Sequence, residues 1–322
     1  MRKYKMTIAG SMIILGILIS SCLYPFYGPA DYEKEIFKYD GKGGLIGRAP
    51  FPPSLHHIFG TNPNGEDMFL IVLDGAKYTI ITAFIVTFLR LLLGVVIGIL
   101  LSFSHPNIKT YFKDLFIGFR YIPSIIIALL LMTPVTVQYT GIGIWSIITY
   151  QIFILGIVAF PAVVLTTADM VDELKKQTFI KSSYLMGATH LHIVRKHLFP
   201  YVRSYGLLMG VQQYMNTLVL MMHLGIFSVF IGGPQIGGIN DGSDYPPLAS
   251  LSNEWSGLIG QNFRFLLHYP WVELFPVFGF FFLIIIMNVM KRELTASFQD
   301  FQIASFSKRK RSKQGDIQKR RG

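Results

Sequence analysis

The segment Tyr184 to Pro200, YLMGATHLHIVRKHLFP, concentrates three histidines between two strongly apolar stretches. Histidine is the commonest metal ligand in proteins, but His190, His192 and His197 follow one another at separations of two and five residues. A helix that binds zinc through two histidines places them four residues apart, so that both lie on one face. The spacing therefore favours contact with a partner or with the membrane interface over metal binding.

The other reactive side chains form no catalytic pattern. His56 and His57 are adjacent, so their side chains are expected to diverge, and the single cysteine, Cys22, excludes an internal disulfide. The only Gly-Lys pair, Gly41 and Lys42, is followed by another glycine, so the chain lacks the G-x-x-x-x-G-K-[S/T] loop that binds nucleotide phosphates. The sequence predicts no cofactor or metal in this chain and no ATP hydrolysis by it.

A few polar residues interrupt apolar stretches and are candidates for lining a transport path. Arg90 lies in FLRLLLGVV, and a central arginine costs about 2.5–3.5 kcal/mol on membrane-insertion scales, so it rarely faces lipid. Gln212, Asn216 and His223 lie on one stripe of a helix. The alternatives for these residues are an arginine that reaches the interface and ordinary hydrogen bonds between helices.

The composition sets the environment in which these residues act. Of 322 residues, 52% are hydrophobic and only 15% are charged, with a mean hydropathy of +0.47. Several continuous apolar stretches are as long as the roughly 20 residues that a helix needs to cross a bilayer. The pattern is typical of an all-α membrane protein, and the net charge of +11 fits loops held in the cytoplasm better than nucleic-acid binding.

Six transmembrane helices are expected, with both termini in the cytoplasm, because most lysines and arginines then lie on the cytoplasmic side. The six expected spans are Met6 to Tyr27, Tyr78 to Phe103, Tyr111 to Met132, Ile142 to Thr167, Ser204 to Ile231, and Trp271 to Met290. Two loops, 28–76 and 232–270, would be extracellular, the second with little regular structure. Residues 77–290 would form a core of five helices, after a first helix within 1–27. Residues 291–322 would be a basic cytoplasmic tail, and its last part, residues 307–322, is expected to be disordered, either as a topology signal or in contact with anionic lipid.

The long cytoplasmic loop, residues 169–203, explains the basic segment. Gly187 can end one short helix in a left-handed conformation, and Thr189 can cap a second. Leu191, Val194 and Leu198 would share one apolar face of the second helix, which Pro200 would stop. The expected element is a pair of short helices whose apolar face packs against the bundle or against a cytoplasmic partner.

This segment resembles the coupling loop of ABC importer permeases, whose pattern is Glu-Ala-Ala, three residues, Gly, about nine residues, then Ile or Leu, one residue and Pro. Gly187, Leu198 and Pro200 match, whereas Lys181 to Ser183 stand at the Glu-Ala-Ala positions. The resemblance assigns contact with an ATPase to Ser182, Ser183, Gly187, Ala188, Thr189, Leu191, Leu198 and Pro200.

Two further stretches resemble the peptide and nickel permeases of that family. Residues 53–80 are similar to its pattern Gly-Thr-Asp, two residues, Gly-Arg-Asp, seven residues, Gly-Ala-Arg. The matching positions are Gly60, Thr61, Gly65, Asp67, Gly75 and Ala76, while Asn62, Glu66 and Lys77 depart from it. YPWVELFP, residues 269–276, is the second stretch.

The resemblance implies a type I ABC importer permease in the plasma membrane. It implies as partners a homologous second permease, two cytoplasmic ATPase subunits that bind ATP and Mg, and an extracytoplasmic binding protein that delivers peptide or a metal chelate. The alternatives are a stand-alone secondary transporter or channel, for which the expected repeats and intramembrane carboxylates are missing from the sequence, and a membrane scaffold that recruits a partner through its basic tail.

Overall fold

The computed structural model describes residues 4–137, 143–236 and 248–319. Small parts of the expected N-terminal end, the loop 232–270 and the basic tail lie outside these residues. The long helices are α1 (Lys5–Tyr27), α2 (Met68–Phe103), α3 (Pro106–Tyr121), α4 (Ser124–Val137), α5 (Ile144–Lys175), α8 (Phe199–Ile226) and α10 (Pro270–Lys319). The short elements are β1 (Phe37–Tyr39), β2 (Leu45–Arg48), α6 (Thr178–Leu185), α7 (His190–Ile193), the π-turn η2 (Val194–Leu198), β3 (Pro234–Ile236), β4 (Leu248–Ser250), α9 (Trp255–Asn262) and the 3₁₀ turn η3 (Phe263–Phe265).

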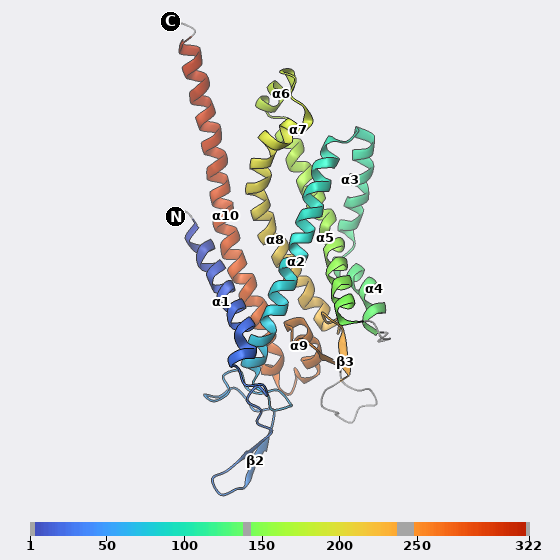
Figure 1. Cartoon of the computed structure of the whole chain (residues 1–322), viewed down its shortest axis with the longest axis vertical. Helices are drawn as coiled ribbons and strands as arrows, with labels where there is room; N and C mark the ends of the chain where they lie inside the picture. The colour runs from blue at the N-terminus through green and yellow to red at the C-terminus, as the bar shows by residue number, and fades with distance from the viewer. Residues whose placement is uncertain (1–3, 138–142, 237–247, 320–322) are drawn as a thin grey trace.

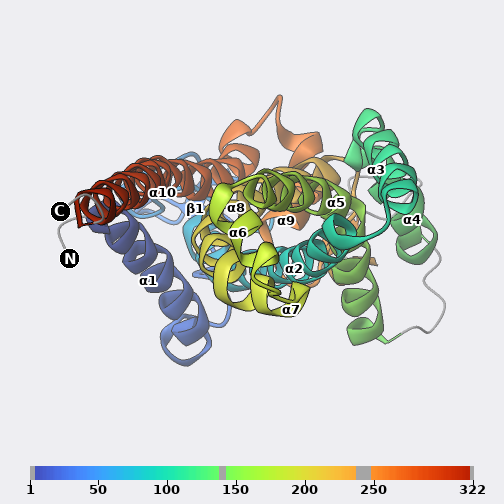
Figure 2. The ribbon, with the colours of Figure 1, turned by 90° about the horizontal axis from the view of Figure 1, so that it is seen from above.

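The long helices form an elongated bundle (Figure 1). Seen from above, α2, α5 and α8 occupy its centre, with α1 and α10 at one edge and α3 and α4 at the other (Figure 2). The α6–α7 segment and the last turns of α10 extend toward one end, here called the α6 end. The antiparallel β1–β2 hairpin and α9 lie at the other, the hairpin end.

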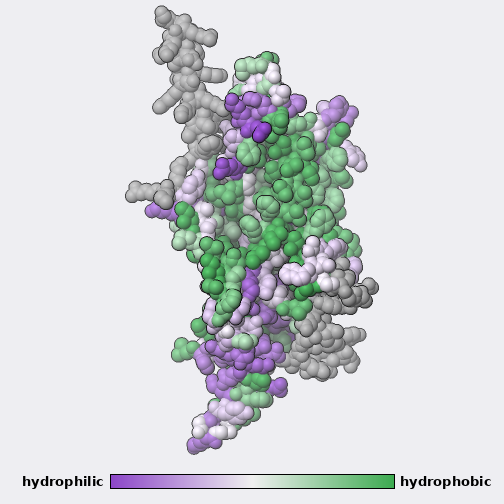
Figure 3. Space-filling view, in the orientation of Figure 1, coloured by the Kyte–Doolittle hydropathy of each residue, from purple (hydrophilic) through white to green (hydrophobic). Residues whose placement is uncertain are grey.

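On the face shown in Figure 3, apolar residues cover the middle of the bundle and hydrophilic residues gather toward both ends. Among the described residues, four helices, α1, α2, α5 and the first part of α10, are long and apolar enough to cross a membrane, and α3 with α4 makes a fifth if this bent pair is one span. The chain is therefore a helical, multi-pass membrane protein. The six expected spans are reproduced only in part.

The third expected span is broken rather than continuous. The axes of α3 and α4 differ by 80° across a short break at Ile122 and Pro123. Proline disfavours the helical conformation of the preceding residue, and Ile122 is accordingly extended. The fifth expected span corresponds to α8, which ends at Ile226 instead of Ile231 and is not among the strongly apolar helices. Polar residues such as Gln212, Gln213 and Asn216 lower its hydropathy.

Three other expectations are corrected. The loop predicted to run to Ala76 ends earlier, because the Asp67 carboxylate accepts hydrogen bonds from the backbone N–H groups of Phe69 and Leu70 and caps α2 at Met68. The loop 232–270 contains regular structure, namely β3, β4, α9 and η3. The tail expected to be disordered continues α10 as far as Lys319, since no proline interrupts it after Pro276.

Glycines bring α2 and α5 into close contact, the most extensive in the bundle. A Cβ added at Gly94 would lie 2.5 Å from Val163 Cβ, and one at Gly98 would lie 2.7 Å from Thr167 Cβ. Both distances are shorter than any normal carbon–carbon contact. The Gly-x-x-x-Gly pair thus allows close helix packing.

We expect Gly94→Ala to destabilise the protein by about 1–3 kcal/mol, because the new methyl group forces apart two packed helices. The matched control is Gly16→Ala in α1, where an added Cβ meets nothing within 4 Å. Alanine favours a helix over glycine, so this control is expected to be neutral or stabilising. Thermal unfolding of both variants in detergent measures the difference. Equal melting temperatures for the two variants would contradict the packing role.

Candidate functional site

The α6–α7 segment is a folded element at the α6 end of the bundle. Gly187 has a φ of +85°, and the turn that follows α6 is closed by hydrogen bonds from Gly187 N to Tyr184 O, 2.9 Å, and from Ala188 N to Ser183 O, 3.0 Å. These two bonds are those of a Schellman motif, which ends a helix at a left-handed glycine. The Thr189 hydroxyl accepts a hydrogen bond from His192 N and caps α7. Both sequence predictions for this turn are confirmed.

The apolar face of the segment differs from the expected one. Ile180, Ile193 and Leu198 are fully buried and pack with Val171 of α5, whereas Leu191 is 65% exposed. The reason is the π-turn η2, in which hydrogen bonds span five residues and bring Ile193 and Leu198, rather than Leu191 and Leu198, to the same side.

Pro200 does not stop the helix, because it lies in the first turn of α8, where its missing N–H costs no hydrogen bond. The chain therefore passes from the π-turn directly into a long helix.

Polar contacts fix the two short helices against each other. The Ser183 hydroxyl donates to Phe179 O and lies 3.3 Å from His197 Nε2, and the Tyr184 hydroxyl lies 3.1 Å from His190 Nδ1. Partial burial raises the pKa of Tyr184, so its hydroxyl keeps its proton. His190 and His197 thus serve contacts between α6 and the α7–η2 turn. Ser182 is exposed and donates to Thr178 O of its own helix.

Three apolar side chains project from this element. Leu185 is 89% exposed, Met186 80% and Leu191 65%. We call them the terminal apolar surface. A buried cluster of Ile180, Ile193 and Leu198 lies beneath it, so the surface sits on a packed element. Such a patch at the end of a helical bundle is suited to contact with another protein.

A cavity of about 500 Å³ opens at the other candidate site, beside α8. Arg90, Asn216 and His223 line it, together with Gln213, which the sequence analysis missed. Gln212 is outside this lining, since it donates to Asn216 Oδ1 and accepts from Lys291 Nζ of α10. Successive residues on a helix point about 100° apart, so Gln212 and Gln213 face different sides of α8. Gln213 and Asn216 line the cavity, and the prediction that Gln212 lines it was wrong.

Arg90 is fully buried and connects three helices. Its Nε and Nη2 donate to Leu155 O of α5, at 3.0 and 2.7 Å, and its Nη1 donates to Thr217 Oγ1 of α8, at 2.9 Å. These acceptors are neutral, and no aspartate or glutamate is among the described residues that line the cavity. The cavity wall therefore carries a positive charge that is hydrogen-bonded without a counter-ion.

The two stretches that resemble peptide and nickel permeases, residues 53–80 and 269–276, meet at the hairpin end. The Thr61 hydroxyl accepts from Phe51 N, and Thr61 O accepts from Trp271 Nε1 at 3.2 Å. Gly75 packs against the backbone of Asn253, where no Cβ would fit. These residues thus build the folded end of α2 rather than a reactive site.

Beside this end, Glu254 is buried and caps α9. Burial raises the pKa of its carboxyl group, although hydrogen bonds from Ser256, Ile231 and Gly257 oppose the shift.

Comparisons with known proteins agree with this geometry. No family model matches the chain. The oligopeptide transport system permease protein OppC of Bacillus subtilis is 26% identical over 277 residues, 85% of this chain and 79% of the relative. The glutathione transport system permease protein GsiD of Escherichia coli is 22% identical and covers 90% of this chain and 84% of the relative. A chain of the inward-facing MetNI methionine ABC transporter matches with a TM-score of 0.50 at 22% identity, over 71% of this chain and 97% of that one.

The helical bundle thus has the fold of a chain of that transporter. The relatives confirm the resemblance found in the sequence: over most of its length the chain is similar to permease subunits of peptide and glutathione transport systems, and it is an integral membrane protein.

Proposed function

We propose that this chain is a permease subunit of an ABC importer and forms one half of a translocation path for short peptides or a related small solute such as a metal chelate. The relatives named as oligopeptide, dipeptide and glutathione permeases support this substrate class. The cavity beside Arg90 would form part of the path, with Asn216 and His223 as polar contacts. A guanidinium in its wall favours solutes that carry a carboxylate. A stand-alone transporter or channel is not favoured by these relatives.

The full assembly would contain a homologous second permease, two cytoplasmic ATPase subunits that bind ATP and Mg, and an extracytoplasmic substrate-binding protein. In this arrangement all six expected spans cross the membrane, with α8 as one of them and both termini in the cytoplasm. The α6 end would then face the cytoplasm and the hairpin end the outside. The alternating course of the chain between the two ends of the bundle supports this topology.

The α6–α7 segment would dock on an ATPase subunit. The observation that carries this proposal is the terminal apolar surface, Leu185, Met186 and Leu191, held on a buried cluster and joined to α8 without a break. Docking on such a segment would transmit ATP-driven movement to the bundle. The exposed side of Ser182 and the turn at Gly187 and Ala188 would border the contact.

We expect Leu185→Glu, combined with Met186→Glu, to reduce the amount of ATPase subunit that co-purifies with the tagged permease at least about 10-fold. Each apolar side chain buried in a contact contributes about 1.5–3 kcal/mol, and the new charges would add a desolvation cost. The matched control is Leu55→Glu, an exposed leucine at the hairpin end, which should leave co-purification unchanged. Full retention of the ATPase by the double variant would contradict docking here. So would labelling of Met186→Cys from outside the cell.

A further inference from the structure

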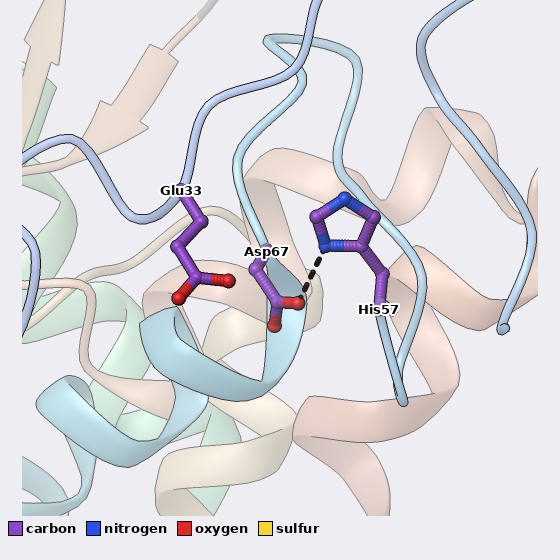
Figure 4. Close-up of side chains that lie close together, drawn as sticks. All are labelled: Glu33, His57 and Asp67. Atoms are coloured by element: carbon purple, nitrogen blue, oxygen red, sulfur yellow. Dashed lines mark hydrogen bonds and ion pairs between the residues drawn. The ribbon is translucent and has the colours of Figure 1, made fainter. Parts of the chain in front are cut away.

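Two carboxylate side chains and one imidazole converge at the hairpin end, where α2 begins (Figure 4). Glu33 comes from the loop after α1, His57 from the loop after β2, and Asp67 caps α2. One potential ligand atom from each lies within 4.8 Å of the other two. His57 and Asp67 are buried, whereas Glu33 is exposed and closes the group from the solvent side.

Both ring nitrogens of His57 face carboxylates. Nδ1 lies 2.7 Å from Asp67 Oδ2, and Nε2 lies 3.3 Å from Glu35 Oε2. A neutral imidazole carries one N–H, so it can donate to only one of the two. If Nε2 donates to Glu35, the lone pair of Nδ1 points at an oxygen of Asp67. Two acceptors at that distance repel each other unless they share a proton or, after a small widening, a metal ion.

Glu33 adds a second carboxylate to the same spot. Within the part of the chain that the structure describes, its side chain has no hydrogen bond or ion pair of its own, and its backbone is left-handed with a φ of +52°. Asp67 is fixed in place because its other oxygen accepts from two backbone N–H groups. Glu33, Glu35 and Asp67 together outweigh the single positive charge that His57 can carry. The electrostatics thus favour an added cation.

We propose that Glu33, His57 and Asp67 bind a divalent transition-metal ion, with zinc as the preferred occupant. One imidazole nitrogen and two carboxylate oxygens suit zinc better than calcium or magnesium, which prefer oxygen ligands alone. Ligand atoms at the usual zinc distances lie about 3.3 Å apart in a tetrahedral site. The 2.7 Å contact between His57 and Asp67 therefore needs only a small widening.

Glu35 completes the arrangement without touching the metal. A ligating histidine usually donates its other N–H to a carboxylate, which fixes the ring orientation. Glu35 stands at Nε2 of His57 in that position. The ion would join the loop that carries Glu33 and the loop that carries His57 to Asp67 at the start of α2. Its fourth coordination position would be open to water or to an incoming ligand.

The sequence analysis predicted no metal at His56 and His57 because adjacent side chains diverge. Divergence was wrong, because the two ring centroids lie only 4.8 Å apart, but His56 is exposed and His57 alone is buried. The other ligands come from residues 24 positions earlier and 10 positions later in the chain, Glu33 and Asp67. Spacing rules for short sequence motifs cannot predict a metal site whose ligands lie this far apart in the chain.

The test is a zinc chloride titration of the full-length chain, purified in detergent without a histidine tag and stripped with a chelator. We expect one zinc ion per chain and a rise in melting temperature, because a ligand that binds only the folded state stabilises it. Glu33→Gln and His57→Gln should weaken zinc binding at least about 100-fold, and Glu35→Gln about 10- to 100-fold. The matched control, His56→Gln, should bind zinc like the wild type.

Glu33→Gln decides the test if His57→Gln fails to fold, because Glu33 is exposed and has no hydrogen bond to lose. A wild-type chain that binds no zinc and melts at the same temperature with and without it would overturn the proposal, and would leave a proton as the bridge between His57 and Asp67. Equal weakening by His56→Gln and His57→Gln would also overturn it, since it would indicate surface binding.

Discussion

Arg90→Met is expected to leave the fold intact while solute transport falls at least about 10-fold. The side chain is fully buried, and its three hydrogen bonds go to Leu155 O and Thr217 Oγ1. Methionine has a similar length and fills the space without a charge. The variant therefore separates the packing role of this side chain from its positive charge.

Stability should survive because neither acceptor depends on Arg90 alone. Leu155 lies inside α5, whose helical backbone bonds remain, and the Thr217 hydroxyl still donates to Gln213 O. Replacing a buried charge by a well-packed apolar side chain is often neutral, or stabilising by about 1–4 kcal/mol, since the desolvation cost disappears. A buried guanidinium without a counter-ion is thus poorly explained by stability. Its position in the cavity wall is the observation on which its proposed role in the path rests.

Two further variants control this interpretation. Thr217→Val removes one of the three hydrogen bonds but keeps the charge, so transport should stay within about 3-fold of the wild type. Arg90→Lys keeps the charge but loses the planar fork that reaches α5 and α8 together, and should lower stability by about 1–3 kcal/mol while it retains partial transport. Transport in the reconstituted assembly and thermal unfolding measure the two effects. Unchanged transport in Arg90→Met would assign Arg90 to helix packing alone.

Local rules predicted the parts of this molecule whose causes are local. Long apolar stretches gave α1, α2, α5 and α10, because a helix satisfies its own backbone in a membrane. The turn between α6 and α7 could also be predicted, because Gly187 and Thr189 act on backbone groups of neighbouring residues. The position of Arg90 inside the bundle followed from its cost in lipid.

Features that depend on distant neighbours were missed. The π-turn η2 buries Ile193 and leaves Leu191 exposed. No residue type in its sequence, VRKHL, predicts a π-turn. Gln213 lines the cavity, whereas Gln212 faces α10, where its side-chain oxygen accepts a hydrogen bond from Lys291 Nζ. The cluster at the start of α2 needs three separate segments and a left-handed Glu33, and only tertiary structure brings these together.

Gly187→Val is expected to lower transport-coupled ATP hydrolysis in the full assembly about 5- to 30-fold. Gly187 has a φ of +85°, a conformation that costs other residues about 1–2 kcal/mol, and more for a β-branched side chain. That energy corresponds to a shift of the same 5- to 30-fold in the population of the native turn. Because the turn sets the direction of α7 relative to α6, its loss would displace Leu191 from Leu185 and Met186.

The open surroundings of Gly187 make the cause testable. An added Cβ would meet nothing within 4 Å, so the cost in this chain comes from the backbone alone. Asparagine tolerates the left-handed region, and Gly187→Asn should therefore keep activity within about 3-fold of the wild type. Gly206→Val in α8 is the matched control, since that glycine is equally open but helical. If Gly187→Asn is as damaging as Gly187→Val, the space above the glycine, rather than its conformation, is what the ATPase contact requires.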